Sequence, residues 1–272
     1  MSAVRTTVVK AAINGGWGKS YHPATPIIPS ELAEASRAAA AAGADFVHFH
    51  PRTGDGEQSI RAEDVDRALL AIREVSDIPV GITTGLWCCG NDPGERYRQV
   101  AAWRELPDFA SVAFSEQGAA ETANLLVDRG IVLESAVWTL DDVPALLASP
   151  TLARNTRILI EPLEEQPDDA VRTARAIAGV IREAGVDCPL LYHGDAATVW
   201  PVLRAAIEDS AQVRIGLEDG KNLPDGSLAA DNDALIRVTR REIDLHAHAS
   251  QTIFGGVSSA YTARTSGACQ AR

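Results

Sequence analysis

Short runs of β-branched and other apolar residues alternate along the chain with longer segments in which apolar residues recur at helical spacing. In the segment 61–75, for example, Val65, Leu69, Ile72 and Val75 share one helix face. The expected strands span 6–13, 44–52, 78–84, 109–114, 131–137, 157–160, 189–192 and 212–217. The expected helices span 31–42, 61–75, 93–106, 119–129, 141–148, 168–184, 198–209 and 229–243. The pattern therefore predicts eight strand-then-helix units.

Strands that alternate with helices form parallel sheets, and eight such units close most economically into a (β/α)8 TIM barrel. A length of 272 residues suits one such domain, and the composition shows no internal break. We expect a single α/β barrel over residues 1–245 and a C-terminal tail over 246–272. The tail is small, polar and irregular from about Ser250, and either packs on a neighbouring subunit or is disordered. A doubly wound open sheet is the alternative, although no G-x-G-x-x-G follows the first strand.

Composition narrows the classes of partner. The formal net charge is −12, which argues against nucleic acid or an anionic membrane surface, since both require a basic patch. A hydrophobic content of 46% is enough for a large core. The N-terminus lacks the apolar segment of a signal peptide, and no apolar run reaches the roughly 18 residues that span a bilayer. We therefore expect a cytoplasmic protein.

Two local patterns indicate less than they first suggest. The cysteines Cys88, Cys89, Cys188 and Cys269 have no C-x-x-C spacing, so neither a zinc knuckle nor a disulfide framework is indicated. The adjacent pair Cys88-Cys89 leaves redox activity as a minor alternative. Gly18-Lys19-Ser20 resembles the end of a phosphate-binding loop, but the glycine required five positions earlier is Ile13. Lys19 remains a candidate contact for an anionic ligand.

The strand at 44–52 carries two histidines in phase. Side chains alternate between the faces of a strand, so His48 and His50 share one face while Val47 and Phe49 share the other. The last strand ends at Glu218-Asp219. Barrel closure brings the second and eighth strands to within about 10 Å of each other. His48, His50 and Glu218 then form a His₂-carboxylate set with an open position, a pattern typical of catalytic zinc.

Each part of this pattern also has an ordinary interpretation. An H-x-H pair alone is often a polar strand end, and Glu218-Asp219 alone is often a solvated turn. Arg214 is more informative, because a charge inside a barrel strand must be paired, and Asp219 or Glu218 is the evident partner. Glu134 within strand 131–137 is either functional or a buried hydrogen-bonding group. Further polar residues at strand ends are Asn14, Arg52, Thr83, Thr84, Ser115, Glu116, Glu161 and His193.

In this arrangement the chain resembles the β-keto acid cleavage enzymes, a group that includes 3-keto-5-aminohexanoate cleavage enzyme. The two most specific segments are AGADFVHFHPR at 42–52 and VRIGLED at 213–219. Shorter segments at 14–16, 26–31, 83–85, 107–111 and 133–134 support the resemblance, which extends in the same order to about residue 245.

The resemblance implies a zinc-dependent TIM barrel that condenses a β-keto acid with acetyl-CoA to give acetoacetate and a new acyl-CoA. It assigns the zinc ligands to His48, His50 and Glu218, and a catalytic dyad to Arg214 and Asp219. Thr84 matches the position that holds the substrate carboxylate. Glu134 matches an acid of strand five and is expected as a third catalytic residue. Asn14 and Ser115 are further candidate substrate contacts. A homo-oligomer, in particular a tetramer, is expected from the family.

Two segments depart from the family pattern. The strand-four segment 111–115 lacks the usual glycine-containing ending, and 135–139 replaces an acidic, glycine-bearing segment. The chain between strands five and seven is also short. These changes affect the substrate region, so the particular keto acid and the CoA co-substrate stay open, while the metal site is intact.

Two other functions are compatible with the sequence. A metal-dependent hydrolase on the same barrel also uses H-x-H, but it needs more histidines on later strands, and only His193 contributes there. A non-catalytic protein that binds an acyl-CoA or keto acid is the second alternative. The charged set Arg214, Glu218 and Asp219 argues against it, since a buried charged cluster without a use is destabilising.

Overall fold

The first strand is hydrogen-bonded on both sides, and this closes the sheet. β1 (Val9–Ala12) pairs in parallel with β2 (Phe46–Phe49) on one side and with β8 (Gln212–Ile215) on the other. The strands follow one another around the barrel in chain order. The expected (β/α)8 TIM barrel is therefore confirmed, and an open doubly wound sheet is excluded.

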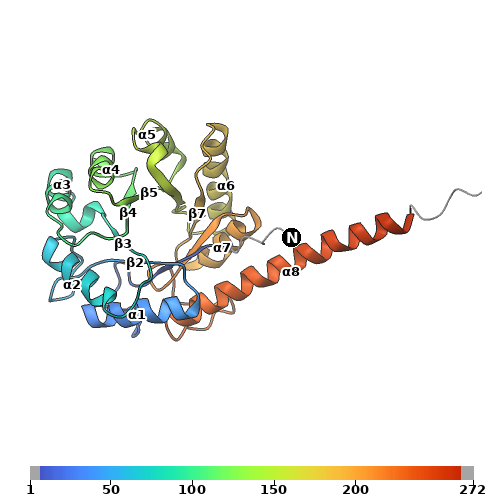
Figure 1. Ribbon diagram of the computed structural model, residues 1–272, viewed down its shortest axis with the longest axis horizontal. Helices are drawn as coiled ribbons and strands as arrows, with labels where there is room; N and C mark the ends of the chain where they lie inside the picture. Colours follow the sequence, from blue (N-terminus) through green and yellow to red (C-terminus); the bar gives the residue numbers. More distant parts are fainter. Residues whose placement is uncertain (1–6, 265–272) are drawn as a thin grey trace, which may run out of the picture.

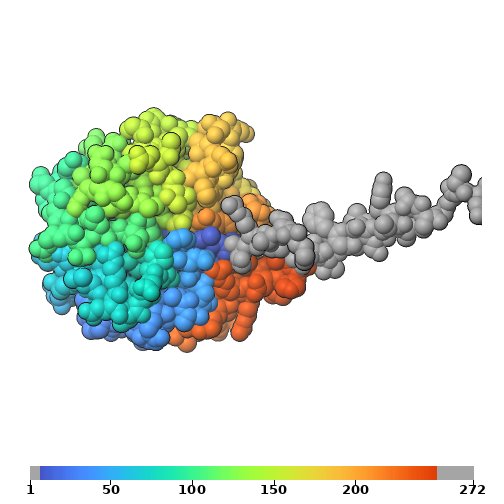
Figure 2. All heavy atoms as spheres, viewed as in Figure 1, coloured from blue at the N-terminus to red at the C-terminus, as the bar shows by residue number. Residues whose placement is uncertain are grey.

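The computed structural model describes residues 7–264, with side chains through residue 249. The other strands are β3 (Val80–Thr83), β4 (Phe109–Ala113), β5 (Val132–Val137), β6 (Asn155–Ile160) and β7 (Leu190–Tyr192). The helices are α1 (Pro29–Ala42), α2 (Ala62–Arg73), α3 (Pro93–Ala101), α4 (Ala119–Asp128), α5 (Val143–Leu147), α6 (Pro167–Glu183), α7 (Val199–Glu208) and α8 (Asn232–Arg264). They form a ring around the strands, and the ring closes where α8 contacts α1 (Figures 1 and 2).

Several helix ends differ from the sequence-based expectation, including the start of α1 and the end of α8. α1 begins at Pro29, two residues before its expected start, and the Glu31 carboxylate accepts a hydrogen bond from the Ile27 N–H at 2.8 Å. α8 continues to Arg264, well past the expected end, and projects from the barrel (Figure 1). Glycine and serine after Ser250 disfavour helix, but extending an existing helix costs far less than starting one. The rest of the expected tail, 265–272, lies outside the described residues.

Side chains inside the barrel form layers because alternate residues of each strand point inward. The middle layer is a small apolar cluster of Ala113, Ala136, Leu159 and Leu191. Val47 and Phe49, on the opposite strand face, belong to the larger core between the barrel and the helices, as expected. On the β4–β7 side of the barrel, this apolar layer lies between the floor and the mouth at the carboxyl ends of the strands.

The floor contains charged residues. Glu134 is fully buried and forms ion pairs with Lys10 of β1 and Arg157 of β6. The Arg157 guanidinium also lies over the Phe46 ring, 4.3 Å from its centroid. Burial lowers the pKa of Lys10 to about 8, against the effect of Glu134. These contacts favour the structural interpretation of Glu134 that the sequence left open, because the residue lies four positions, about 13 Å along the strand, before Trp138 at the mouth.

No helix among the described residues combines the length and apolar character needed to cross a membrane.

Replacing Glu134 by alanine should destabilise the barrel strongly. The substitution leaves two buried cations without their shared carboxylate, and we expect the free energy of unfolding to fall by about 3–5 kcal/mol. Urea denaturation of the purified variant measures this loss. Glu34→Ala, which removes a carboxylate from an exposed pair with Arg37, is the matched control and should barely shift the midpoint. Equal stability of the two variants would contradict a structural role for Glu134.

Candidate active site

A cavity of about 290 Å³ opens at the carboxyl ends of the strands, where active sites of this fold lie. His48, His50, Arg214 and Glu218 line one side of it. The two histidines lie on β2 or directly after it, Arg214 lies on β8, and Glu218 lies in the loop after β8. In the closed sheet β1 lies between β2 and β8. The structure thus brings together segments separated by more than 160 positions in the chain.

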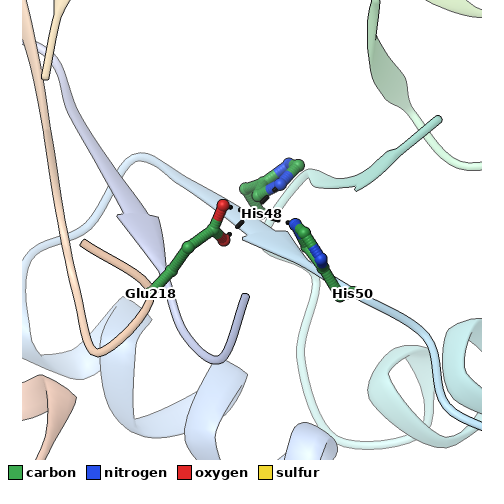
Figure 3. Close-up of side chains that lie close together, drawn as sticks. All are labelled: His48, His50 and Glu218. Carbon is green, nitrogen blue, oxygen red and sulfur yellow. Dashed lines mark ion pairs between the residues drawn. The ribbon is translucent and has the colours of Figure 1, made fainter. Parts of the chain in front are cut away.

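His48, His50 and Glu218 point toward one another (Figure 3). The Glu218 carboxylate lies 3.6 Å from His48 Nε2 and 3.3 Å from His50 Nε2. Three donor atoms of this set lie within 4.8 Å of one another. Ligands about 2.1 Å from a tetrahedral ion are about 3.4 Å apart, so the spacing suits a bound metal ion. Glu218 Oε2 is buried and lacks a hydrogen-bond partner among the described residues, which also fits a ligand atom.

Two residues hold His50 in place. Asn14 accepts a hydrogen bond from the His50 N–H at 2.8 Å and donates one to the His50 carbonyl at 2.9 Å. His50 Nδ1 lies 2.5 Å from Gln58 Oε1, which also accepts from the Trp87 indole at 3.1 Å. A proton on Nδ1 leaves Nε2 with its lone pair toward Glu218. Asn14, expected to contact substrate, therefore orients a candidate metal ligand.

Arg214 binds both carboxylates that follow β8. Its Nε lies 3.1 Å from each oxygen of Asp219, and one of its terminal nitrogens lies 2.9 Å from Glu218 Oε1. All three side chains are largely buried. The pairing expected for Arg214 is therefore present, and the guanidinium fixes both acids at once.

Burial and ion pairing oppose each other in this group. Burial raises the pKa of Asp219 to about 6, although Arg214 acts in the opposite direction. Burial would also raise the pKa of Glu218, but Arg214, His50 and His48 together hold it well below the ordinary value. Burial lowers the pKa of His48. At neutral pH the site therefore offers neutral imidazole and ionised carboxylates, the protonation states that bind metal.

The loop after β1 packs tightly against Glu218. Gly15 has a φ of +51°, and a Cβ added there would lie 2.4 Å from Glu218 Cγ. The Glu218 N–H donates to the Ala12 carbonyl at 3.1 Å, and the Trp17 indole donates to the Glu218 carbonyl at 2.9 Å. Glycine at position 15 is thus required by both backbone conformation and space.

Two other expected substrate contacts do not face the cavity. The Thr84 hydroxyl is used in a hydrogen bond to the Ser111 carbonyl at 2.7 Å, and Ser115 is exposed outside the cavity. Thr83 and Ser111 line the cavity instead. A one-residue difference moves a side chain to the other strand face, and the sequence leaves that register uncertain at a strand end.

The cavity is also lined by Glu116, Glu161 and His193, which were expected as polar residues at strand ends without an assigned role. His193 Nδ1 lies 3.8 Å from Asp219 Oδ1, and its Nε2 lies 3.4 Å from Glu161. Glu116 also lines the cavity, where the fully buried Arg96 binds it at 2.6 Å. Their positions after β4, β6 and β7 could have predicted that they line the cavity, because the strand ends of a barrel converge on one mouth.

The adjacent cysteines do not form an activated thiol pair. Burial raises the pKa of Cys88 to about 12 and that of Cys89 to about 11. Reactive cysteines have lowered pKa values, so redox activity is disfavoured. Lys19 forms an exposed ion pair with Glu31 at 2.9 Å and does not line the cavity.

Comparisons with known proteins give a family and a fold. The family model described as beta-keto acid cleavage enzyme matches residues 6–248. The ternary complex of ObcA with a C4-CoA adduct and oxalate is 16% identical, with a TM-score of 0.66, over 86% of this chain and 68% of that chain. The binary complex of ObcA with oxaloacetate is 16% identical, with a TM-score of 0.63, over 86% and 67%. A type I 3-dehydroquinate dehydratase from Clostridium difficile shares the fold at 10% identity and a TM-score of 0.55, over 87% and 93%.

Gly15→Ala should weaken metal binding. The added methyl group displaces Glu218, and disturbing the surroundings of a ligand typically lowers metal affinity by about 10–100-fold. Chelator competition with zinc measures the change. Gly18→Ala in the same loop is the control, because nothing lies within 4 Å of a Cβ there. If both variants bind zinc as the parent does, Glu218 is not a ligand.

Proposed function

Because the chain belongs to the β-keto acid cleavage enzyme family, as its motifs indicated, we propose that it condenses a β-keto acid with acetyl-CoA in a zinc-dependent reaction. The products are acetoacetate and the acyl-CoA of the remaining part of the substrate. The observation that carries the proposal is the juxtaposition of His48, His50, Glu218 and Arg214 in one cavity, with Asp219 bound to Arg214 directly behind the lining.

The donor set fits zinc, with two imidazole nitrogens, one carboxylate and room for substrate oxygen. Bound there, zinc supplies a Lewis acid that polarises the β-keto oxygen and acidifies the neighbouring methylene group. We propose that Asp219, which is bound to Arg214 in the same buried group, accepts the methylene proton. Its pKa of about 6 makes it ionised but still basic at neutral pH. Arg214 holds this carboxylate in position throughout.

The substrate carboxylate has candidate partners beside the metal ligands. Thr83 and Ser111 line the cavity on β3 and β4, next to β2. We propose that these hydroxyl groups orient the carboxylate, in place of Thr84 and Ser115. Asn14 acts through His50, and Glu134 acts by supporting the barrel floor.

The solved relatives support the choice of substrates. ObcA structures hold oxaloacetate, a β-keto acid, and a C4-CoA adduct. By analogy we propose a small keto acid and a CoA thioester as substrates of this chain. A cytoplasmic location and a homo-oligomer, with the projecting part of α8 packed on a neighbouring subunit, complete the proposal.

Hydrolysis by the same metal site is the second candidate. His193 is the observation that favours it, because it adds an imidazole to the cavity beside Asp219. Against it, burial and Arg214 hold the pKa of His193 well below its usual value, so it is a poor proton acceptor near pH 7.

Incubation with acetyl-CoA and a panel of β-keto acids tests the reaction, with acetoacetate as the product measured. We expect turnover of at least one panel member and about one zinc per chain in the purified protein. A His48→Ala/His50→Ala double variant should lose both, since it removes two of three ligands. A full zinc complement in that variant would refute the site. Hydrolysis of a lactone or amide in place of acetoacetate formation would favour the second candidate.

Asp219→Asn should abolish turnover while zinc content stays the same, because the amide cannot accept the methylene proton. In the parent, kcat/KM should fall as the pH drops below about 6, where Asp219 becomes protonated. Steady-state kinetics across pH, with metal analysis of both proteins, checks this. An Asp219→Asn enzyme with parental kcat would exclude Asp219 as the base.

A further inference from the structure

Trp87 lies on the wall of the cavity, in a short 3-10 helix (Leu86–Cys89) that follows β3. Its indole N–H donates a hydrogen bond to Gln58 Oε1 at 3.1 Å. The same oxygen lies 2.5 Å from His50 Nδ1. The Gln58 side chain therefore joins a cavity wall to a candidate metal ligand, and the proposed reaction assigns no role to Trp87.

The shared oxygen determines where His50 carries its proton. An indole nitrogen can only donate, so the Gln58 atom that faces Trp87 has to be the amide oxygen. An oxygen in this position accepts from His50 only when the imidazole proton is on Nδ1. His50 Nε2, which lies 3.3 Å from Glu218, then carries the lone pair that binds a metal ion.

The opposite orientation of the Gln58 amide would have the reverse effect. Its NH₂ group would face His50 Nδ1, which would have to accept, so the proton would move to Nε2 and block the ligand atom. Within the described part of the chain, His50 and Trp87 are the hydrogen-bond partners of this amide. His50 alone is compatible with both orientations, because it can adopt either tautomer. The Trp87 N–H excludes the wrong one, because two donors cannot hydrogen-bond each other.

Two contacts fix the position of Trp87. Its ring lies against the backbone of Gly85, where an added Cβ would be 2.3 Å from Trp87 Cζ2. The preceding Leu86 N–H donates to Glu116 at 3.0 Å, and the fully buried Arg96 binds Glu116 at 2.6 Å. Burial does not explain the position of the indole, because the side chain is 44% exposed. The surrounding contacts instead give its N–H a fixed direction.

We propose that Trp87 is a positioning residue of the metal site, which fixes the Gln58 amide and thereby keeps His50 in the tautomer that binds the ion. The inference rests on the metal site of the proposed function and is independent of the keto acid and the CoA thioester.

Trp87→Phe keeps an aromatic ring and removes the N–H. Both amide orientations then become compatible with His50, and we expect zinc affinity to fall by about 10-fold, as on removal of other partners that orient a metal ligand. Competition with a chromophoric chelator measures the affinity. A purely structural role would instead lower the urea midpoint and leave zinc affinity at the parental value, and that result would overturn the proposal.

Gln58→Glu tests the role of the amide orientation. A carboxylate has an oxygen in both positions, so it accepts from His50 Nδ1 without being oriented by Trp87. In the Gln58→Glu background, Trp87→Phe should therefore leave zinc affinity unchanged. An equal loss in both backgrounds would assign the effect to lost packing and refute control of the tautomer.

Gly85→Ala displaces the indole without altering Trp87 itself. Gly85 has a φ of −50°, which alanine also adopts, so the collision with the ring is the expected effect. Zinc affinity should fall about as far as in Trp87→Phe. Gly54→Ala, in the loop between His50 and Gln58, is the matched control, because nothing lies within 4 Å of a Cβ there. Parental zinc affinity in Gly85→Ala, or an equal loss in Gly54→Ala, would contradict the proposal.

These measurements separate the role of Trp87 from the proposed function. A parent protein that binds no zinc refutes the metal site and the inference together. A parent that binds zinc but forms no acetoacetate refutes the reaction alone. Equal zinc affinity in the parent, Trp87→Phe and Gly85→Ala refutes the role of Trp87 and leaves the metal site intact.

Discussion

The mouth of the barrel depends on one guanidinium that binds two consecutive carboxylates. Without Arg214, Glu218 and Asp219 would repel each other in a buried site, and neither would keep a fixed direction. With it, Glu218 is directed at the histidines of β2 while Asp219 stays beside the cavity. A buried pair of this kind adds little net stability, so its main effect is geometric. The backbone permits the arrangement because β8 approaches β1 closely at Gly216, where a Cβ would lie 1.9 Å from the Ala12 carbonyl oxygen.

Charge inside the barrel is separated into two levels. The floor holds two basic side chains, Lys10 and Arg157, around one carboxylate, Glu134. The mouth holds one guanidinium with two adjacent carboxylates. The two groups meet between β1 and β8, where Lys10 is the register partner of Arg214 and the Arg214 charge helps to lower the pKa of Lys10.

The fold and the metal triad were readable from the sequence because both follow from simple periodicities. Alternation within 44–52 placed His48 and His50 on one face, and the eightfold alternation of strands and helices brought Glu218 to them. Substrate contacts were harder. Thr83 and Thr84 are neighbours of the same type, and only the register at the end of β3 decides which one faces inward. Glu134 was ambiguous because its cations, Lys10 and Arg157, lie on strands far away in the chain.

The two walls of the cavity are supported by different parts of the chain. The wall with the candidate metal ligands depends on β1, β2 and β8, through Asn14, Gly15 and Arg214. The opposite wall, with Ala113, Trp138 and Glu161, comes from β4 to β6. Substitutions in this second group can alter which molecules bind in the cavity without moving the candidate metal ligands. Natural variation and laboratory selection can therefore exchange substrates on one side of the barrel while the chemistry on the other side is inherited unchanged.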